Sequence, residues 1–156
     1  ESGAQHVLDA MKKGSSVEDI LRAGRLLRAH GVEIGLFVMI GYPGERREDL
    51  DRTLQMLHEL DAEVTLISVA HPMKGTTFYD EVSDRIQRPP GWEERNGGRL
   101  AFDMDYSARF YELAQRAMWS ELRLVRGLRE GGSGMRNMLQ GARLPVYRTG
   151  MRLLGR

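Results

Sequence analysis

Two loops carry residue types that could bind a polar ligand. Gly41 to Glu45, with the sequence GYPGE, follows one apolar run, and His71 to Thr76, HPMKGT, follows another. Glycine permits positive φ angles and close backbone approach, proline stiffens a turn, and a helix N-terminus offers unpaired N–H groups. The first loop is therefore a candidate cradle for a polar cofactor group. An ordinary strand-to-helix turn is the alternative, since Gly and Pro also serve turn geometry alone.

His71 is a candidate base, metal ligand or pocket wall at a strand end. His6, His30 and His58 form no HExxH arrangement or other i, i+4 pair, so no metal site is predicted. The chain has no GxSxG elbow, and its glycines match neither the dinucleotide fingerprint nor the Walker A loop. The sequence contains no Cys, which excludes disulfides, a cysteine nucleophile and any iron–sulfur cluster held by this chain's own thiolates.

The elements that must position these loops alternate along the first part of the chain. They are a helix over 17–30, a strand over 32–40, a helix over 45–60, a strand over 64–70 and a short helix near 77–83. The continuous apolar run of 32–40 predicts a strand covered on both faces. The alternation predicts an α/β fold with adjacent parallel strands joined by a right-handed crossover. Glu1, Gly41 and His71 should then cluster at the carboxyl edge of the strands.

The second part of the chain differs in composition and charge. Two Pro and three Gly in 88–99 predict an exposed loop, and an apolar stripe predicts a helix from Ser107 to about Arg129. Gly131 to Gly134 is expected to be a flexible break, followed over 135–156 by disorder or a loosely held helix, because Pro145 and three glycines interrupt the pattern. Ten Arg against three Glu after residue 106 indicate a solvated helical face or a basic surface for an anionic partner.

Three ordered segments carry a family resemblance. They are Glu1-Ser2-Gly3-Ala4-Gln5 continuing to Gly14, then Gly35 to Glu45, then His71 to Thr76. In this order they resemble the second half of the radical S-adenosylmethionine (radical SAM) enzymes, particularly those with an N-terminal cobalamin-binding domain. The resemblance covers roughly residues 1–84. It implies the C-terminal half of a partial (β/α)6, TIM-like barrel with a helical, basic C-terminal extension.

The resemblance also implies cofactors and a site. S-adenosylmethionine would lie across the strand ends, with a [4Fe-4S] cluster held by a CxxxCxxC motif outside this chain, and cobalamin would belong to a domain that is also outside it. The residues expected to contact S-adenosylmethionine are Glu1, Ser2, Gly41, Tyr42, Pro43, Gly44, Glu45, Ala70, His71 and Pro72. The first two would approach the ribose and methionine parts, and the others the adenine. No catalytic residue and no metal ligand is assigned.

The implied function belongs to a longer polypeptide, of which this chain is expected to be a fragment. The complete enzyme would generate a 5′-deoxyadenosyl radical that abstracts hydrogen from an unknown substrate, and the fragment alone is expected to be inactive because the missing N-terminal half of the same polypeptide supplies the cluster. The alternative is a non-catalytic α/β binding module whose basic tail docks on an anionic membrane or nucleic acid. Between these two tail partners, a membrane is favoured and nucleic acid is not expected.

The sequence also predicts boundaries and a location. The expected divisions are 1–84 for the half-barrel, 85–106 for a loop and connection, 107–130 for a helical extension and 131–156 for a flexible basic tail. No apolar run approaches the roughly 20 residues that cross a bilayer, and the first residues do not resemble a signal peptide. A cytoplasmic protein is expected; a tail with no partner is favoured, and peripheral membrane attachment through the tail is the alternative.

Overall fold

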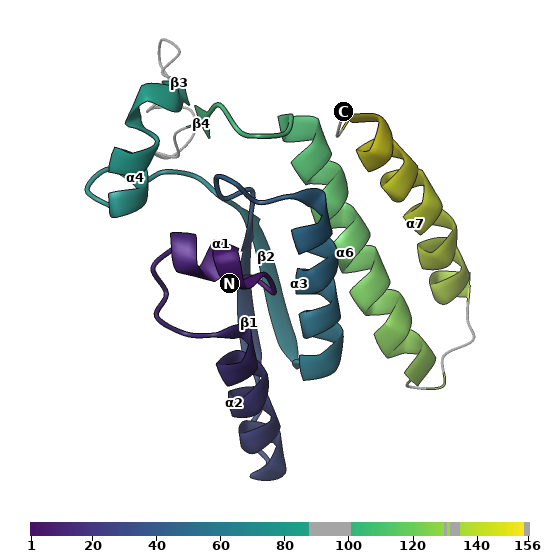
Figure 1. Cartoon of the computed structure of the whole chain (residues 1–156). Helices are drawn as coiled ribbons and strands as arrows, with labels where there is room; N and C mark the ends of the chain where they lie inside the picture. Colours follow the sequence, from purple (N-terminus) through teal and green to yellow (C-terminus); the bar gives the residue numbers. More distant parts are fainter. Residues whose placement is uncertain (88–100, 130, 132–134, 155–156) are drawn as a thin grey trace.

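The computed structural model describes residues 1–87, 101–129, 131 and 135–154. The elements are α1 (Gln5–Ala10), α2 (Val17–Ala29), β1 (Gly35–Ile40), α3 (Arg47–Leu60), β2 (Val64–Val69), α4 (Thr77–Glu81), a 3-10 helix (Ser83–Arg85), β3 (Ile86–Gln87), β4 (Ala101–Phe102), α6 (Ala108–Arg129) and α7 (Met135–Leu154) (Figure 1). The expected loop over 88–99 lies outside the described residues.

The central feature is a parallel pair of strands. β1 pairs with β2 in a register that places Gly35 opposite Val64 and Ile40 opposite Val69. Helix α3 connects them, and its buried leucines at 50, 54, 57 and 60 follow the predicted helical spacing. The predicted parallel pairing is therefore confirmed. The described chain is a mixed α/β structure with this small sheet, and the barrel is not among the features that it shows.

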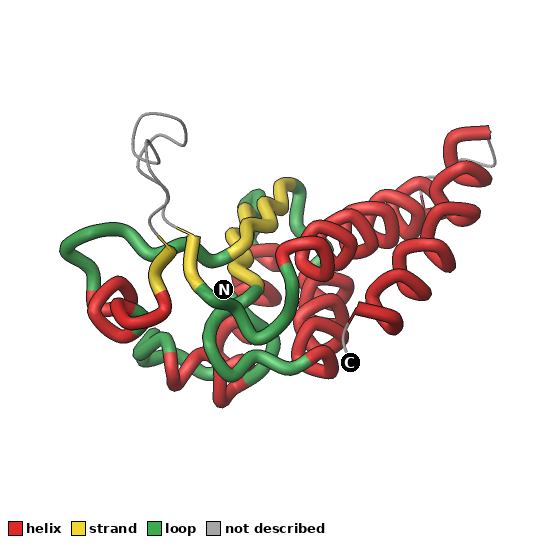
Figure 2. The backbone as a smooth tube through the Cα atoms, turned by 90° about the horizontal axis from the view of Figure 1, so that it is seen from above, coloured by secondary structure: helices red, strands yellow, loops and turns green. Residues whose placement is uncertain are grey.

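The two faces of this sheet are buried very differently. Val38, Ile40 and Ile67 are at most 3% exposed and pack against α3 and α6. Phe37 and Leu66, which are paired on the opposite face, are 68% and 52% exposed. The prediction that the 32–40 strand is covered on both faces is wrong at Phe37, because the long helices α3 and α6 cover only the face that carries Val38 and Ile67 (Figure 2).

Helix α2 forms as predicted but buries little of its apolar face. Ser16 and Asp19 make a reciprocal capping box, and Gly31 takes the positive φ angle (69°) expected at the helix end. Gly24 is buried against Leu60 of α3, whereas Leu26 remains 60% exposed. Helix α2 therefore contacts α3 closely at Gly24, its one fully buried residue, and much of its apolar surface stays exposed.

Helix α6 completes the main core. Ser107 accepts a hydrogen bond from Phe110 N, as expected of an N-cap, and Phe110, Ala114 and Met118 are buried against α3 and the sheet. The first part of the predicted stripe is thus confirmed. This helix belongs to the same hydrophobic core as the parallel strands.

Residues 135–154 take the helical one of the two forms expected for the C-terminal segment. A single 20-residue helix, α7, contains Pro145 and packs along α6 (Figure 1). Met151 is buried in the main core, Gly150 lies against Leu113, and Arg148 forms an ion pair with Glu121 of α6. Tertiary contact with α6 overrides the local helix-breaking signals, since helices gain most of their stability from packing. The proposed division at residue 130 stays a prediction.

A small antiparallel pair of strands was not predicted. β3 pairs with β4, placing Ile86 opposite Phe102 within the segment expected to be a loop and connection. Phe102 packs with Ala70 and Val82 in a second apolar cluster. This cluster connects the end of β2 to the segment that leads into α6.

Candidate functional site

The predicted loops meet at the carboxyl ends of the parallel strands. Ala70 N donates to Ile40 O at 2.8 Å, so the residues after β1 and β2 start side by side. Met39 N donates to Glu1 O at 3.1 Å, which places the N-terminal segment along the other edge of β1. The backbone around Glu1, Gly41 and His71 therefore gathers at one end of the strand pair, as the α/β interpretation expects.

Two carboxylates accept hydrogen bonds from the backbone of the Gly41 to Glu45 loop, and one of them belongs to Glu45 itself. Gly41 N donates to Glu45 Oε2 at 2.5 Å, and Gly44 N donates to Asp105 Oδ2 at 2.6 Å. Gly41 and Gly44 have φ angles of 85° and 82°, which residues with a Cβ rarely adopt. Pro43, between them, is partly exposed. The two carboxylates thus fix a turn whose backbone angles favour glycine at both positions.

The two glycines of this loop serve different purposes. A Cβ on Gly41 would lie 2.4 Å from Met104 Cε and 3.2 Å from Tyr111 Cε1, so the residue allows the loop to pack against the segment leading into α6. No atom lies within 4 Å of the corresponding position on Gly44. Space for a ligand is therefore present beside the Cα of Gly44, although its N–H is bonded to Asp105, whereas Gly41 supports the turn-geometry alternative.

Burial strongly perturbs Glu45. The residue is only 2% exposed, and this burial raises the pKa of its carboxyl to about 7; the Gly41 N–H acts in the opposite direction, and the nearby Asp49 charge adds to the increase. Its Oε1 has no hydrogen-bond partner among the described residues. A carboxyl that titrates near neutral pH at a strand end can act as a proton donor or acceptor.

Tyr42 faces a cavity of about 320 Å³ beside the strand ends. Its hydroxyl donates to Glu81 Oε2 at 2.7 Å, and its ring stacks on Phe78 at a centroid distance of 4.9 Å. Burial, followed by the effect of Glu81, raises the pKa of Tyr42 to about 12, so the phenol stays protonated at neutral pH. Lys12 and Lys13 also line this cavity, which has the size of a small-molecule site.

Glu1 and Ser2 differ in their freedom to reach a ligand. The Glu1 carboxylate pairs with Lys13 Nζ at 2.7 Å and thereby lies next to the cavity lining. Ser2 is fully buried: its Oγ accepts from Ala4 N and lies 3.3 Å from Thr53 Oγ1. Of the two, Glu1 is the one placed for ligand contact, while Ser2 fastens the N-terminal segment to α3.

Ala70, His71 and Pro72 are close to the first loop but lie mainly within the protein. Ala70 belongs to the apolar cluster around Phe102, and Pro72 is fully buried. His71 is partly exposed, with Nδ1 3.2 Å from Val69 O. These three residues form a wall rather than a row of free polar groups, so the predicted adenine contact there would be made by backbone and apolar atoms.

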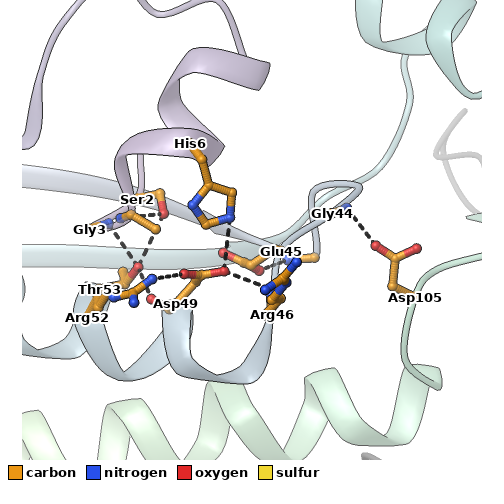
Figure 3. Close-up of polar contacts among 12 residues, drawn as sticks. Ser2, Gly3, His6, Gly44, Glu45, Arg46, Asp49, Arg52, Thr53 and Asp105 are labelled. Atoms are coloured by element: carbon orange, nitrogen blue, oxygen red, sulfur yellow. Dashed lines mark hydrogen bonds and ion pairs between the residues drawn. The ribbon is translucent and has the colours of Figure 1, made fainter.

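The sequence analysis missed a buried carboxylate beneath the loop. Asp49, 1% exposed, accepts a hydrogen bond from Arg46 N and pairs with His6 at 3.1 Å and Arg52 at 2.6 Å (Figure 3). An acidic residue in the first turn of a helix was the available signal, since it stabilises the N-terminus. This network supports the loop from the α3 side and does not line the cavity.

The described residues carry no group of three or more His, Asp or Glu side chains that could hold a metal ion. None of the described helices is long and apolar enough to cross a membrane. The candidate site comprises the strand-end loop, the adjoining cavity and the Glu1–Lys13 pair.

Comparison with known proteins adds an independent finding. No family model matches the chain. A protein of Aromatoleum aromaticum is 33% identical over 82 residues, which cover 51% of this chain and 18% of the relative. A protein of Burkholderia thailandensis is 27% identical over 114 residues, which cover 67% of this chain and 25% of the relative. The chain is similar to tRNA-2-methylthio-N(6)-dimethylallyladenosine synthases.

These synthases are radical SAM enzymes, so they support the radical SAM part of the sequence-based resemblance. They give no support to the cobalamin-binding subtype. The matched regions span a quarter or less of the synthases' own length. The activity and substrate of the synthases are therefore not transferred to this chain by similarity alone.

Proposed function

We propose that this chain forms the C-terminal, S-adenosylmethionine-binding half of a radical SAM enzyme. The observation that carries the proposal is the strand pair itself: one face is covered by helices, the other exposes Phe37, Val64 and Leu66, and the motif-bearing loops meet at its carboxyl end. Apolar side chains on an uncovered sheet face are typical of a surface that packs against further structure. The N-terminal half of a barrel is the partner that this proposal assigns to it.

The site fits S-adenosylmethionine in part. Glu1 and Lys13, which pair with each other, place a carboxylate and an ammonium group beside the cavity, and Gly44 has open space next to its Cα. When bound together with a reduced cluster, this cofactor supplies radical hydrogen abstraction. The chain's own residues would bind and orient it. The thiolates for the cluster must come from outside these 156 residues, since the chain contains no Cys.

Cobalamin, the substrate and a tRNA target are outside this proposal. The names of the relatives mention no cobalamin, and the region matched is a minor part of each of them. The cobalamin and cytoplasmic assignments stay predictions.

The first test compares this chain with a longer one that includes the cluster-binding half. After anaerobic reconstitution with iron and sulfide, the 156-residue chain is expected to retain no cluster and to produce no 5′-deoxyadenosine, whereas the longer protein does both. Iron content and product formation are the measurements. Turnover by the isolated chain, or no cluster in the longer protein, would contradict the proposal.

Replacing Glu1 tests the ligand side of the site. In the longer protein, Glu1→Ala is expected to weaken S-adenosylmethionine binding by about tenfold, because a charged hydrogen-bonding group is lost, while iron content stays unchanged. Isothermal titration calorimetry measures the affinity. Glu33→Ala, which removes an exposed carboxylate before β1, is the matched control. Equal affinities in the two variants would remove Glu1 from the site.

The membrane-binding alternative gains one observation from α7. Val146 and Leu153 are 67% and 69% exposed, and Arg152 is also exposed. A helix with exposed apolar and basic residues can lie on an anionic lipid surface. Under this alternative, co-sedimentation with anionic vesicles is expected at low salt and is lost at high salt.

A double substitution gives this alternative its control. Val146→Ser with Leu153→Ser should reduce vesicle binding several-fold, whereas Leu26→Ser with Val32→Ser, on exposed apolar residues elsewhere, should not. Vesicle binding that does not respond to the α7 substitutions would exclude α7 as the membrane-binding element.

A further inference from the structure

Two buried oxygen atoms lack hydrogen-bond partners among the described residues, and they come from different parts of the chain. One is Glu45 Oε1 in the strand-end loop, and the other is the Tyr111 hydroxyl in the first part of α6. Their residues are 2% and 1% exposed. Buried polar atoms are nearly always paired, so a coincidence of two such atoms calls for a structural explanation.

Both side chains meet at Gly41. Glu45 Oε2 accepts from Gly41 N at 2.5 Å, while the Tyr111 ring lies so near Gly41 that an added Cβ would be 3.2 and 3.3 Å from its Cε1 and Cζ atoms. Burial and then the Glu45 charge raise the pKa of Tyr111; Asp105 and Tyr106 also raise it, and a backbone group of Tyr106 opposes the shift. The carboxyl and the phenol therefore share one enclosed space.

The neighbouring acidic groups already have partners. Asp49, on α3, binds His6 and Arg52, and Asp105, before α6, binds Arg85 at 3.0 Å as well as Gly44 N. Within the described part of the chain, the Tyr111 hydroxyl is thus the unpaired donor beside Glu45. A phenol O–H donates readily to a carboxylate oxygen.

We propose that Tyr111 is a positioning residue for the Gly41 to Glu45 loop: its hydroxyl donates to a buried water that in turn donates to Glu45 Oε1, and this bridge holds the loop in its ligand-binding shape. Its consequence for S-adenosylmethionine rests on the proposed function, but the link between α6 and the loop does not. Helix α6 lies beyond the motif-bearing residues 1–84, so this assigns a role in the site to the C-terminal extension.

The test follows the loop by NMR as a function of pH. In the wild-type chain, the Gly41 amide signal should titrate with Glu45, whose carboxylate accepts its hydrogen bond. Tyr111→Phe keeps the ring but removes the donor, so the midpoint should move upward by about one pH unit, because the ionised carboxylate loses a hydrogen bond. Tyr147→Phe removes a hydroxyl from another residue packed on the same core and should leave the midpoint unchanged.

A second variant protects the test against a folding defect. Glu45→Gln should abolish the titration of the Gly41 amide, and adding Tyr111→Phe to it should then change nothing further in the pH response of that amide. An unshifted midpoint in Tyr111→Phe, or a Gly41 titration that survives in Glu45→Gln, would overturn the inference.

Calorimetry separates this inference from the proposed function. In the longer, cluster-containing protein, Tyr111→Phe should weaken S-adenosylmethionine binding several-fold at pH 8, and Tyr147→Phe should not. Failure of the wild-type protein to bind S-adenosylmethionine would defeat the proposed function, while a shifted glycine midpoint would still support the Tyr111–Glu45 link. Binding that is identical in both Tyr variants would overturn the role of Tyr111 in the site.

Discussion

The difference in free energy of unfolding between Glu45→Gln and the wild type is expected to favour the variant more at neutral pH than at pH 4. The wild-type carboxyl has a pKa of about 7 in the folded state, against 4.5 as its ordinary value. The unfolded chain therefore releases this proton first as the pH rises. The free energy of unfolding of the wild type therefore decreases as the pH rises from the lower to the higher of these two pKa values. The total decrease is about 3 kcal/mol, because each pKa unit corresponds to about 1.4 kcal/mol.

Chemical denaturation at several pH values measures this effect. Glutamine keeps an oxygen that accepts from Gly41 N but cannot ionise, so the stability difference between variant and wild type should grow from pH 4.5 to 7 and then level off. Glu48→Gln, on an exposed side chain of α3, is the matched control. A stability difference that does not change with pH would show that the pKa of Glu45 is the same in the folded and unfolded states.

Gly3→Ala is expected to lower the free energy of unfolding by about 3 kcal/mol, a large effect for one methyl group. A Cβ at this position would lie 2.5 Å from Arg52 O and 2.6 Å from Thr53 Cα. These are backbone atoms of α3 and cannot turn aside. The N-terminal segment would have to move away, which would also weaken the bond from Gly3 N to Thr53 Oγ1.

The matched control for this change is Gly35→Ala, because no atom lies within 4 Å of a Cβ at Gly35 and that residue is exposed. Thermal unfolding of the two variants and the wild type gives the comparison. Equal stability of the Gly3 and Gly35 variants would mean that the N-terminal segment is not packed against α3. The glycine of the Glu1-Ser2-Gly3 sequence would then need another explanation.

Local patterns were sufficient to predict the elements around the site. Leucines at spacings of three and four predicted α3 and its buried stripe, and two apolar runs predicted the parallel strands. Because parallel strands end at a common edge, the meeting of the Gly41 and His71 loops could also be predicted. The position of α7 could not, since its contact with α6 outweighs the local signal of Pro145.

The supports of the site depend on contacts between distant residues. Ser2 meets Thr53 across 51 positions of sequence, and Tyr111 meets Gly41 across a still longer separation. Neither pairing follows from periodicity or residue type. The exposure of Phe37 and Leu66 was also unpredictable, because an apolar strand has the same pattern whether or not a second layer covers it.

The shared core of α6 and the parallel strands has a consequence for how this polypeptide can be divided. Val38, Ile40 and Leu54 lie in one cluster with Phe110 and other residues of α6. A chain ended at residue 84, after the last of the sequence motifs, would expose that cluster to water. The motifs thus occupy only part of the folded unit, and cooperative unfolding and resistance to proteolysis should belong to a larger unit that includes α6.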